Sequence, residues 1–252
     1  MKLLRFESKD GDIRFGLLEG DIVSEIKGDI FGGYKVTQIE HRPTEIKFLP
    51  PCFPTKIVAV GLNYRDHAAE MKKSPPEEPL IFMKPTTALI GHEDKIIYPK
   101  YMSSRVDYEG ELAVVIGKRT KWVSEDDALN YVFGYTCIND VTARDLQAKD
   151  VQYTRAKGFD TFAPMGPVIE TELDPSDIQI STFLNGERKQ HSRTSELIFN
   201  IPRLISFISR VMTLLPGDII ATGTPSGIGP MKSGDEVEVE IEGIGILRNY
   251  VE

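Results

Sequence analysis

The chain has 252 residues, of which 40% are hydrophobic and 27% charged, and its formal net charge is −8 at pH 7. This is the composition of an ordinary globular protein with one large domain, or one domain plus a small one. Lys and Arg form no basic stripe and no apolar run reaches the roughly 20 residues that span a membrane, which argues against nucleic-acid and membrane partners. Cys52 and Cys137 lie far apart outside any CxxC pattern, so we expect a reducing cytoplasm and no zinc–thiolate site or disulfide framework.

Residues 1 to about 48 are predicted to form short strands. The segments KLLRF, IRFGLL and IVSEI are separated by turn-forming residues such as Asp10-Gly11. The proline-dense segment LPPCFPTK follows and suits a linker, because proline restricts the backbone. We therefore predict a small N-terminal β domain at residues 1–50 and a larger domain at residues 51–252.

Strands continue after this linker, mixed with short helices. KIVAVG, LIFMKP, GELAVVIG and VFGYTCIND are predicted strands, and residues 67–71 are a predicted helical turn. SEDDALNYV is predicted as a helix capped by Ser124, and TARDLQ as a short helix capped by Thr142.

The C-terminal part contains the clearest helix signal. IQISTFLNGERKQ predicts a hairpin with Asn185-Gly186 as its turn. In IPRLISFISRVMTLL apolar residues recur at helical spacing, and Pro202 suits the first turn. Strands dominate without regular βαβ alternation, so the predicted fold class is α+β, mainly β.

Three carboxylates stand two residues apart in RVDYEGELAVVIGK: Asp107, Glu109 and Glu111. This spacing places them on one face of a strand, roughly 6–7 Å apart, where two charges repel by roughly 2–3 kcal/mol at an effective dielectric of about 20. On an exposed strand they would form a solvated face. The apolar run after Glu111 instead indicates a buried strand, in which carboxylates must be neutralised, paired or bound to a metal.

A further carboxylate, Asp140, stands where the strand GYTCIND is predicted to end. Asp140 is either a turn residue or the third member of an oxygen cage with the strand glutamates. Ligation by oxygen alone suits Mg²⁺, Mn²⁺ or Ca²⁺ and does not suit zinc.

Four motifs in one order, VDYEGELAVVIG, GYTCINDVTARDLQ, RAKGFDTFAPMGP and ATGTPSGIG, together resemble the fumarylacetoacetate hydrolase family. The resemblance covers about residue 55 to the C-terminus and implies a metal-binding catalytic domain folded as a mixed β-sandwich roll of the type of that family's C-terminal domain. In the family a Glu-x-Glu pair and a later Asp bind a divalent cation, and these positions match Glu109, Glu111 and Asp140. The implied cofactor is Mg²⁺, with Mn²⁺ and Ca²⁺ as alternatives. Asp107 lies outside this ligand set and is interpreted as either adjacent to the ligands or solvated.

His67 and Glu70 in NYRDHAAEM lie three residues apart, on one face of a helical turn. Such a pair either orients a basic imidazole or is a surface His beside an acid, which is the more common case. The resemblance favours the first: acylpyruvate hydrolases and oxaloacetate decarboxylases of the family carry a His-x-x-Glu dyad here, on a mobile lid, that handles the attacking water. His41, His92 and His191 are left unassigned.

Four further positions are candidate site residues. Lys157 in RAKGFD matches a family lysine that contacts the substrate near the metal, and Gln147 matches a polar residue of the same pocket. Thr224 lies on a glycine-rich loop that either holds a substrate carboxylate or is a simple tight turn. That loop lacks the Lys-Ser/Thr ending of a phosphate-binding P-loop. Lys84 is a candidate for binding a second substrate anion, or else a solvated lysine.

A 2-oxo acid can chelate such a cation, and the charge stabilises an enolate that serves hydrolysis, decarboxylation and isomerisation alike. We predict C–C bond cleavage in a small 2-oxo or β-diketo carboxylate, by acylpyruvate hydrolysis or oxaloacetate decarboxylation. The alternatives are a 2-hydroxyhepta-2,4-diene-1,7-dioate isomerase or decarboxylase of aromatic catabolism and a non-catalytic, metal-dependent dicarboxylate-binding protein. The resemblance also implies a homodimer.

Overall fold

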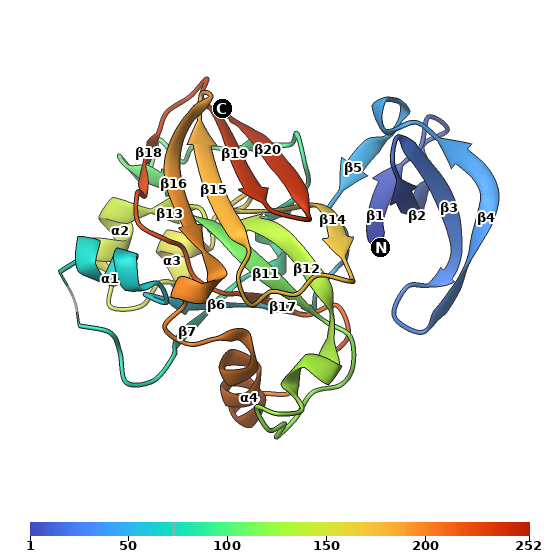
Figure 1. The fold of residues 1–252 in the computed structure, drawn as a ribbon. Coiled ribbons are helices and arrows are strands. Elements are labelled where there is room, and N and C mark those ends of the chain that lie inside the picture. Colours follow the sequence, from blue (N-terminus) through green and yellow to red (C-terminus); the bar gives the residue numbers. More distant parts are fainter. Residues whose placement is uncertain (73) are drawn as a thin grey trace.

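The computed structural model describes residues 1–72 and 74–252 and is mainly β, as predicted. Figure 1 shows the N-terminal strands, in blue, beside a larger body in which three sheets pack around one another. The strand β14 (Ala163–Glu170) lies at the junction of the two parts. The main apolar core contains residues of both parts, such as Phe6 and Val114, and is therefore shared between sheets.

The N-terminal strands form an antiparallel meander. Its members are β1 (Lys2–Glu7), β2 (Ile13–Glu19), β3 (Ile22–Asp29) and β4 (Gly33–His41), and β5 (Lys47–Leu49) returns to pair with β1. Sequence reasoning missed β4, because its mostly exposed residues show no buried alternation. β1 also pairs with β14, with Leu3 opposite Ile169, so the meander extends the large sheet of the body. The division at residues 50 and 51 stays a prediction.

The strand that carries the candidate site lies in the middle of that large sheet. β11 (Gly110–Ile116) lies between β12 (Val132–Asn139) and β17 (Ile219–Ala221), followed by β6 (Ile57–Gly61) and β7 (Leu80–Lys84). The two-residue strand β8 (Leu89–Ile90) pairs with β14. Every residue of β11 is buried, because Leu112 and Val114 face one apolar cluster and Ala113 and Val115 face another. This explains the unbroken apolar run in the sequence.

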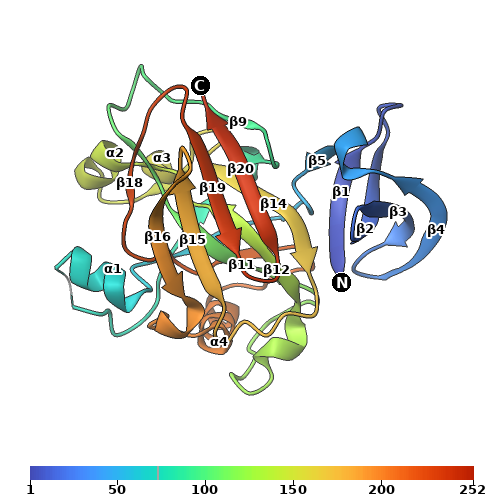
Figure 2. The ribbon, with the colours of Figure 1, turned by 45° about the horizontal axis from the view of Figure 1, so that its top comes forward.

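Two smaller sheets complete the body. One has the order β16 (Glu187–Arg193), β15 (Gln179–Leu184), β19 (Glu236–Ile241), β20 (Gly245–Val251) and β9 (Lys95–Ile96), and it crosses β11 and β12 (Figure 2). The other joins β13 (Thr142–Ala143), β10 (Val106–Tyr108) and β18 (Gly229–Met231). The predicted hairpin is confirmed: Asn185 and Gly186 have φ of 52° and 77°, the left-handed values that a tight type I′ turn requires.

The α-helices are short: α1 (Arg65–Glu70), α2 (Arg144–Lys149), α3 (Thr154–Lys157) and α4 (Ile201–Val211). α4 has the predicted Pro202 in its first turn and is capped by Asn200, whose side chain accepts from the Arg203 N–H at 3.0 Å. Short 3₁₀ turns occupy residues 43–45, 86–88, 128–131 and 194–196. Within the described ranges, no helix has the length and apolarity needed to cross a membrane.

One predicted helix, SEDDALNYV, and one predicted cap, Thr142, are wrong. SEDDALNYV forms only the 3₁₀ turn Ala128–Tyr131, although Ser124 Oγ does accept the predicted hydrogen bond from the Asp127 N–H, at 3.2 Å. α2 begins after Ala143, and the hydroxyl of Thr142 donates to the carbonyl oxygen of Asp140 at 2.8 Å. The Thr142 hydroxyl thus forms a local hydrogen bond other than the predicted cap.

Candidate active site

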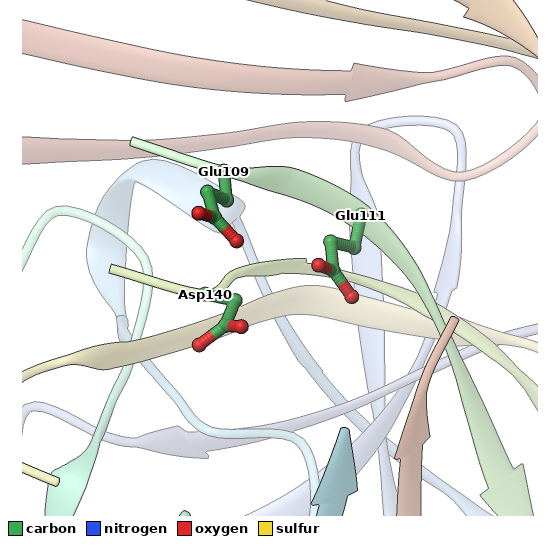
Figure 3. A group of neighbouring side chains, drawn as sticks. All are labelled: Glu109, Glu111 and Asp140. Atoms are coloured by element: carbon green, nitrogen blue, oxygen red, sulfur yellow. The ribbon is translucent and has the colours of Figure 1, made fainter. Parts of the chain in front are cut away.

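Glu109, Glu111 and Asp140 meet at one end of the β11–β12 pair (Figure 3). One oxygen from each lies within 4.8 Å of the others, and all three residues are buried. The register that pairs Gly110 with Asn139 brings the start of β11 next to the residue that follows β12. A 2.8 Å hydrogen bond from the Asp140 N–H to the Glu109 carbonyl fixes this approach. The carboxylates predicted to gather therefore do so.

Two buried lysines partly neutralise this cluster. Nζ of Lys157, at the end of α3, donates to Glu109 Oε2 at 2.8 Å and to Asp140 Oδ2 at 2.5 Å. Nζ of Lys84, at the end of β7, donates to Asp140 Oδ1 at 2.5 Å and to the Val141 carbonyl at 3.2 Å. The interpretation of Lys84 as a solvated lysine is wrong, because its side chain is fully buried.

Glu111 is the crowded member of the cluster. It accepts a 2.8 Å hydrogen bond from the Gly223 N–H, and no ion pair involves it within the described part of the chain. Burial, with the nearby charges of Asp140 and Glu109, raises the pKa of Glu111 well above its ordinary value. A carboxylate crowded by like charges gains most from a cation, and three buried carboxylates match the oxygen ligands that Mg²⁺, Mn²⁺ and Ca²⁺ prefer. The side chains thus fit a divalent cation.

Arg144, at the start of α2, connects Glu109 to Asp107. Its Nε donates to Asp107 Oδ2 at 2.9 Å, its Nη2 donates to Glu109, and its Nη1 donates to Gln147 Oε1 at 2.5 Å. Burial would raise the pKa of Glu109, but Lys157 and Arg144 outweigh it and hold this pKa well below its ordinary value. Sequence reasoning missed Arg144, although it lies in the quoted motif TARDLQ, three residues before Gln147.

Of the two interpretations of Asp107, adjacent to the ligands or solvated, the structure favours the first, because Arg144 links it to Glu109. It is not solvated: the residue is 0% exposed and pairs with Arg144 and with Arg105, whose Nε donates to Asp107 Oδ1 at 2.9 Å. Nor do Asp107, Glu109 and Glu111 share one continuous strand, since β10 ends before Glu109 and β11 starts after it. The break allows Asp107 to belong to a different sheet and still be linked to Glu109 through Arg144.

The predicted dyad lies on α1. His67 is buried, and its Nδ1 is 2.9 Å from Glu70 Oε2. The other oxygen of Glu70 accepts from the Gly227 N–H at 3.1 Å, and Asp66 accepts from the Ser226 hydroxyl at 3.3 Å. Glu70 is therefore held from two sides. When it accepts the Nδ1 proton of His67, Nε2 is left as the basic nitrogen.

A cavity of about 210 Å³ brings these groups together. Its polar wall contains Arg144 and the following predicted site residues: His67, Glu109, Glu111, Asp140, Gln147, Lys157 and Thr224. Its apolar wall includes Leu62, Met71, Leu80 and Phe82. Glu70 and Lys84 do not line the cavity in the described chain but bond to residues that do. A larger hollow of about 480 Å³ beside the start of α4 is lined by other residues, so size alone would misplace the site.

Two aromatic residues of this cavity were not recognised in the sequence. The Phe82 ring centroid lies 5.1 Å from Lys157 Nζ, and the Tyr153 ring meets Phe82 edge-on with centroids 5.4 Å apart. Because Phe82 lies within an ordinary apolar strand, the sequence carried no signal for its position.

The hydroxyl of Thr224 is already engaged by the protein. It donates to the Gly110 carbonyl at 2.9 Å and accepts from Gln190 Nε2 at 2.8 Å. A substrate carboxylate would have to displace the first bond or use backbone N–H groups of the loop. Thr224 as a substrate contact stays a prediction.

The chain is similar to two family models and to curated proteins. A model described as fumarylacetoacetate hydrolase C-terminal matches residues 56–252, and one described as Rv2993c-like, N-terminal, matches residues 1–51. The oxaloacetate tautomerase YisK of Bacillus subtilis is 44% identical over 222 residues, which cover 82% of this chain and 74% of that protein.

Two crystal structures are similar over the whole chain. The first is described as 5-carboxymethyl-2-hydroxymuconate delta-isomerase from Mycobacterium smegmatis, with 47% identity and a TM-score of 0.93 over 100% of this chain and 99% of that one. The second is described as 2-hydroxyhepta-2,4-diene-1,7-dioate isomerase from Mycobacterium marinum, with 44% identity and a TM-score of 0.93 over 100% and 98%.

Proposed function

The chain belongs to the fumarylacetoacetate hydrolase family and is an enzyme of that family, and we propose that it enolises short 2-oxo dicarboxylates of the oxaloacetate type with a bound divalent cation. The observation that carries the proposal is the meeting of a buried carboxylate cage and a His–carboxylate dyad in one cavity of about 210 Å³. That volume is below the roughly 300–1,000 Å³ of sites for drug-sized ligands, which favours a short substrate. The names of the relatives, a tautomerase and two isomerases, support enol chemistry.

In this proposal Glu109, Glu111 and Asp140 hold the cation, which when bound supplies positive charge that favours an enolate over the ketone. Lys157, held between Glu109 and Asp140, adds a fixed ammonium at the same wall of the cavity. Mg²⁺ is the proposed cation, with Mn²⁺ and Ca²⁺ as alternatives that the oxygen ligands also admit.

The proton transfer is assigned to His67. Its Nε2 removes a proton from the carbon next to the 2-oxo group, the C–H electron pair forms the C=C bond, and the carbonyl oxygen takes the negative charge. Return of the proton to that oxygen gives the enol and restores the neutral imidazole. Glu70 keeps the ring oriented and stabilises its protonated form.

The test follows the exchange of the C3 protons of oxaloacetate for deuterium, together with the ultraviolet absorbance of the enol. His67→Ala is expected to lower the enzymatic rate by about 10²–10⁴, the usual contribution of a general base. His191→Ala is the matched control, because that histidine lies on β16 and bonds to Ser181. Full tautomerase activity in His67→Ala would contradict the assignment.

C–C bond cleavage is the second candidate, since the His67–Glu70 dyad is also suited to activating a water molecule. Acylpyruvate hydrolysis needs that water, whereas oxaloacetate decarboxylation needs chelation alone. His67→Ala should therefore lower hydrolysis by about 10²–10⁴ and decarboxylation less. A non-catalytic binding protein would instead bind oxalate in the presence of Mn²⁺ and turn over none of these substrates.

We also propose a homodimer in the cytoplasm. The dimer is implied by family membership, and light scattering that reports a 28.3 kDa particle would reject it. A reducing compartment agrees with Cys52 and Cys137, which are both buried and free.

A further inference from the structure

Gln190 is a buried amide on β16 that the proposed chemistry does not use. It is 1% exposed. Its Oε1 accepts from the Gly110 N–H at 3.1 Å, and its Nε2 donates to Thr224 Oγ1 and to the Pro225 carbonyl, both at 2.8 Å. One side of this amide therefore holds the cage strand, and the other holds the loop that lines the cavity.

The contact with Gly110 is built into the packing of two sheets. Gln190 lies directly opposite Thr182 in the β15–β16 hairpin. A Cβ at position 110 would lie 2.1 Å from Thr182 Oγ1, so only glycine allows β11 to approach this hairpin so closely. Gly110 separates Glu109 from Glu111, and a shift of its backbone would move both carboxylates.

The three residues form a closed ring of hydrogen bonds. The Gly110 N–H donates to Gln190, Gln190 donates to Thr224, and Thr224 donates back to the Gly110 carbonyl. Such cyclic chains of buried hydrogen bonds polarise one another and restrict movement.

The same loop continues to the dyad. Three residues after Thr224, the Gly227 N–H donates to Glu70 at 3.1 Å. The Gly227 carbonyl accepts from the Tyr108 hydroxyl at 2.9 Å, which anchors this end of the loop to β10. The loop at residues 224–227 thus joins the cage strand, through Gln190, to the carboxylate that orients His67.

We propose that Gln190 is a positioning residue that sets the spacing between the carboxylate cage and the His67–Glu70 dyad. It contacts neither substrate nor cation and acts through Gly110 and the loop at residues 224–227. The inference rests on the proposed function for its turnover readout. Its Mn²⁺-binding readout needs no turnover.

The experiment compares Gln190→Met with Asn249→Leu. Asn249 is a matched buried amide on β20 of the same sheet, also 1% exposed, whose Nδ2 donates to the Gly91 and Asp94 carbonyls at 2.8 and 3.0 Å. Both variants remove a buried amide with two carbonyl or hydroxyl acceptors, so both should lower the melting temperature. Gln190→Met alone should weaken Mn²⁺ binding, measured by calorimetry, and lower kcat/KM by about 10- to 100-fold, the usual effect of losing an outer contact of a metal site.

The kinetic split identifies the mode of action. Because Gln190 sets the geometry of the dyad, kcat should fall more than KM rises, and Gln190→Asn, which keeps the amide on a shorter side chain, should recover part of the loss. It also serves as the variant to measure if Gln190→Met does not fold. Equal losses of Mn²⁺ affinity in the Gln190 and Asn249 variants, or wild-type affinity in both, would overturn the proposal. Wild-type protein that binds Mn²⁺ but does not enolise oxaloacetate would contradict the proposed function and leave the Mn²⁺ comparison intact.

Discussion

Two buried carboxylates, Asp218 and Glu111, lie at opposite ends of the short strand β17 in opposite circumstances. Before β17, Asp218 accepts from Thr55 N–H and hydroxyl at 2.9 and 2.7 Å, from Lys56 N–H and Nζ at 3.1 and 2.5 Å, and from the Leu215 N–H at 2.8 Å. After β17, Gly223 donates a 2.8 Å hydrogen bond to Glu111, which lies among the like charges of the cage.

The difference separates a structural carboxylate from a functional one. Each oxygen of Asp218 is satisfied by donors that join two loops, and a lysine balances its charge. Glu111 lacks such a cation within the described residues and faces a cavity. A buried charge is costly unless it is paired, so an under-satisfied carboxylate at a cavity indicates a site that binds a cation.

Glu111→Gln tests the functional end and should have the largest effect. The raised pKa of Glu111 favours the neutral carboxyl in the metal-free protein, and a neutral amide imitates that form. The melting temperature of the metal-free protein should therefore change by no more than about 2 °C. Activity should fall by about 10³ or more, because metal charge stabilisation is worth several kcal/mol. Measured Mn²⁺ affinity equal to that of the wild type would show that Glu111 is not a ligand.

Asp218→Asn tests the structural end. The new NH₂ group would face Lys56 Nζ and the Leu215 N–H, which are both donors. Breaking a buried pair in this way costs about 3–5 kcal/mol, and the melting temperature should fall by about 10 °C. Activity per folded molecule should stay at the wild-type level. If Asp218→Asn is as stable as the wild type but inactive, Asp218 is not the structural counterpart of Glu111.

Addition of Mn²⁺ sharpens the same comparison in the unmodified protein. Ligand at 100 times its Kd stabilises the folded state by about 2.7 kcal/mol, which corresponds to a rise in melting temperature of about 5–10 °C. The rise should persist in Asp218→Asn and vanish in Glu111→Gln. Differential scanning fluorimetry with and without a chelator measures it, and a rise of equal size in Glu111→Gln would place the cation elsewhere.

The carboxylate cage was predictable because its signals are local. Strand alternation and the apolar run after Glu111 indicated burial, the predicted end of the strand GYTCIND indicated Asp140, and the family resemblance implied the ligand set. Even so, the strand break at Glu109 was missed, because Asp107 and Glu111 belong to different sheets that the sequence alone does not separate.

Pairings between distant segments were not predictable. Lys84 bonds to Asp140 across 56 positions, and Gln190 bonds to Gly110 across 80. Lysine and glutamine are usually exposed, and only the packing of sheets buries these two. The same reason explains why Arg144 went unnoticed while its neighbour Gln147 was identified through the family resemblance.

A third ionisable group, the half-buried His92, gives the smallest and most specific test. It lies between the two parts of the chain, with its ring edge-on to Phe48 at a centroid distance of 5.7 Å and its Nδ1 accepting from the Arg248 N–H at 3.1 Å. Burial, followed by the charge of Arg248, lowers its pKa, in spite of nearby acids such as Glu93. The hydrogen bond from the Arg248 N–H requires an unprotonated Nδ1, so the neutral ring of His92 fits this position.

The sign of the pH effect follows from linkage. Since the folded pKa of His92 is lowered, the unfolded chain binds a proton first as the pH falls through the ordinary value of about 6.5, and stability is lost there. His92→Asn keeps an acceptor for the Arg248 N–H but cannot titrate. It should lose some stability at every pH through the missing contact with Phe48, yet its melting temperature should fall less than that of the wild type between about pH 7.5 and about pH 5.5. If the melting temperatures of both proteins fall equally over that interval, protonation of His92 does not contribute to the loss of stability in acid.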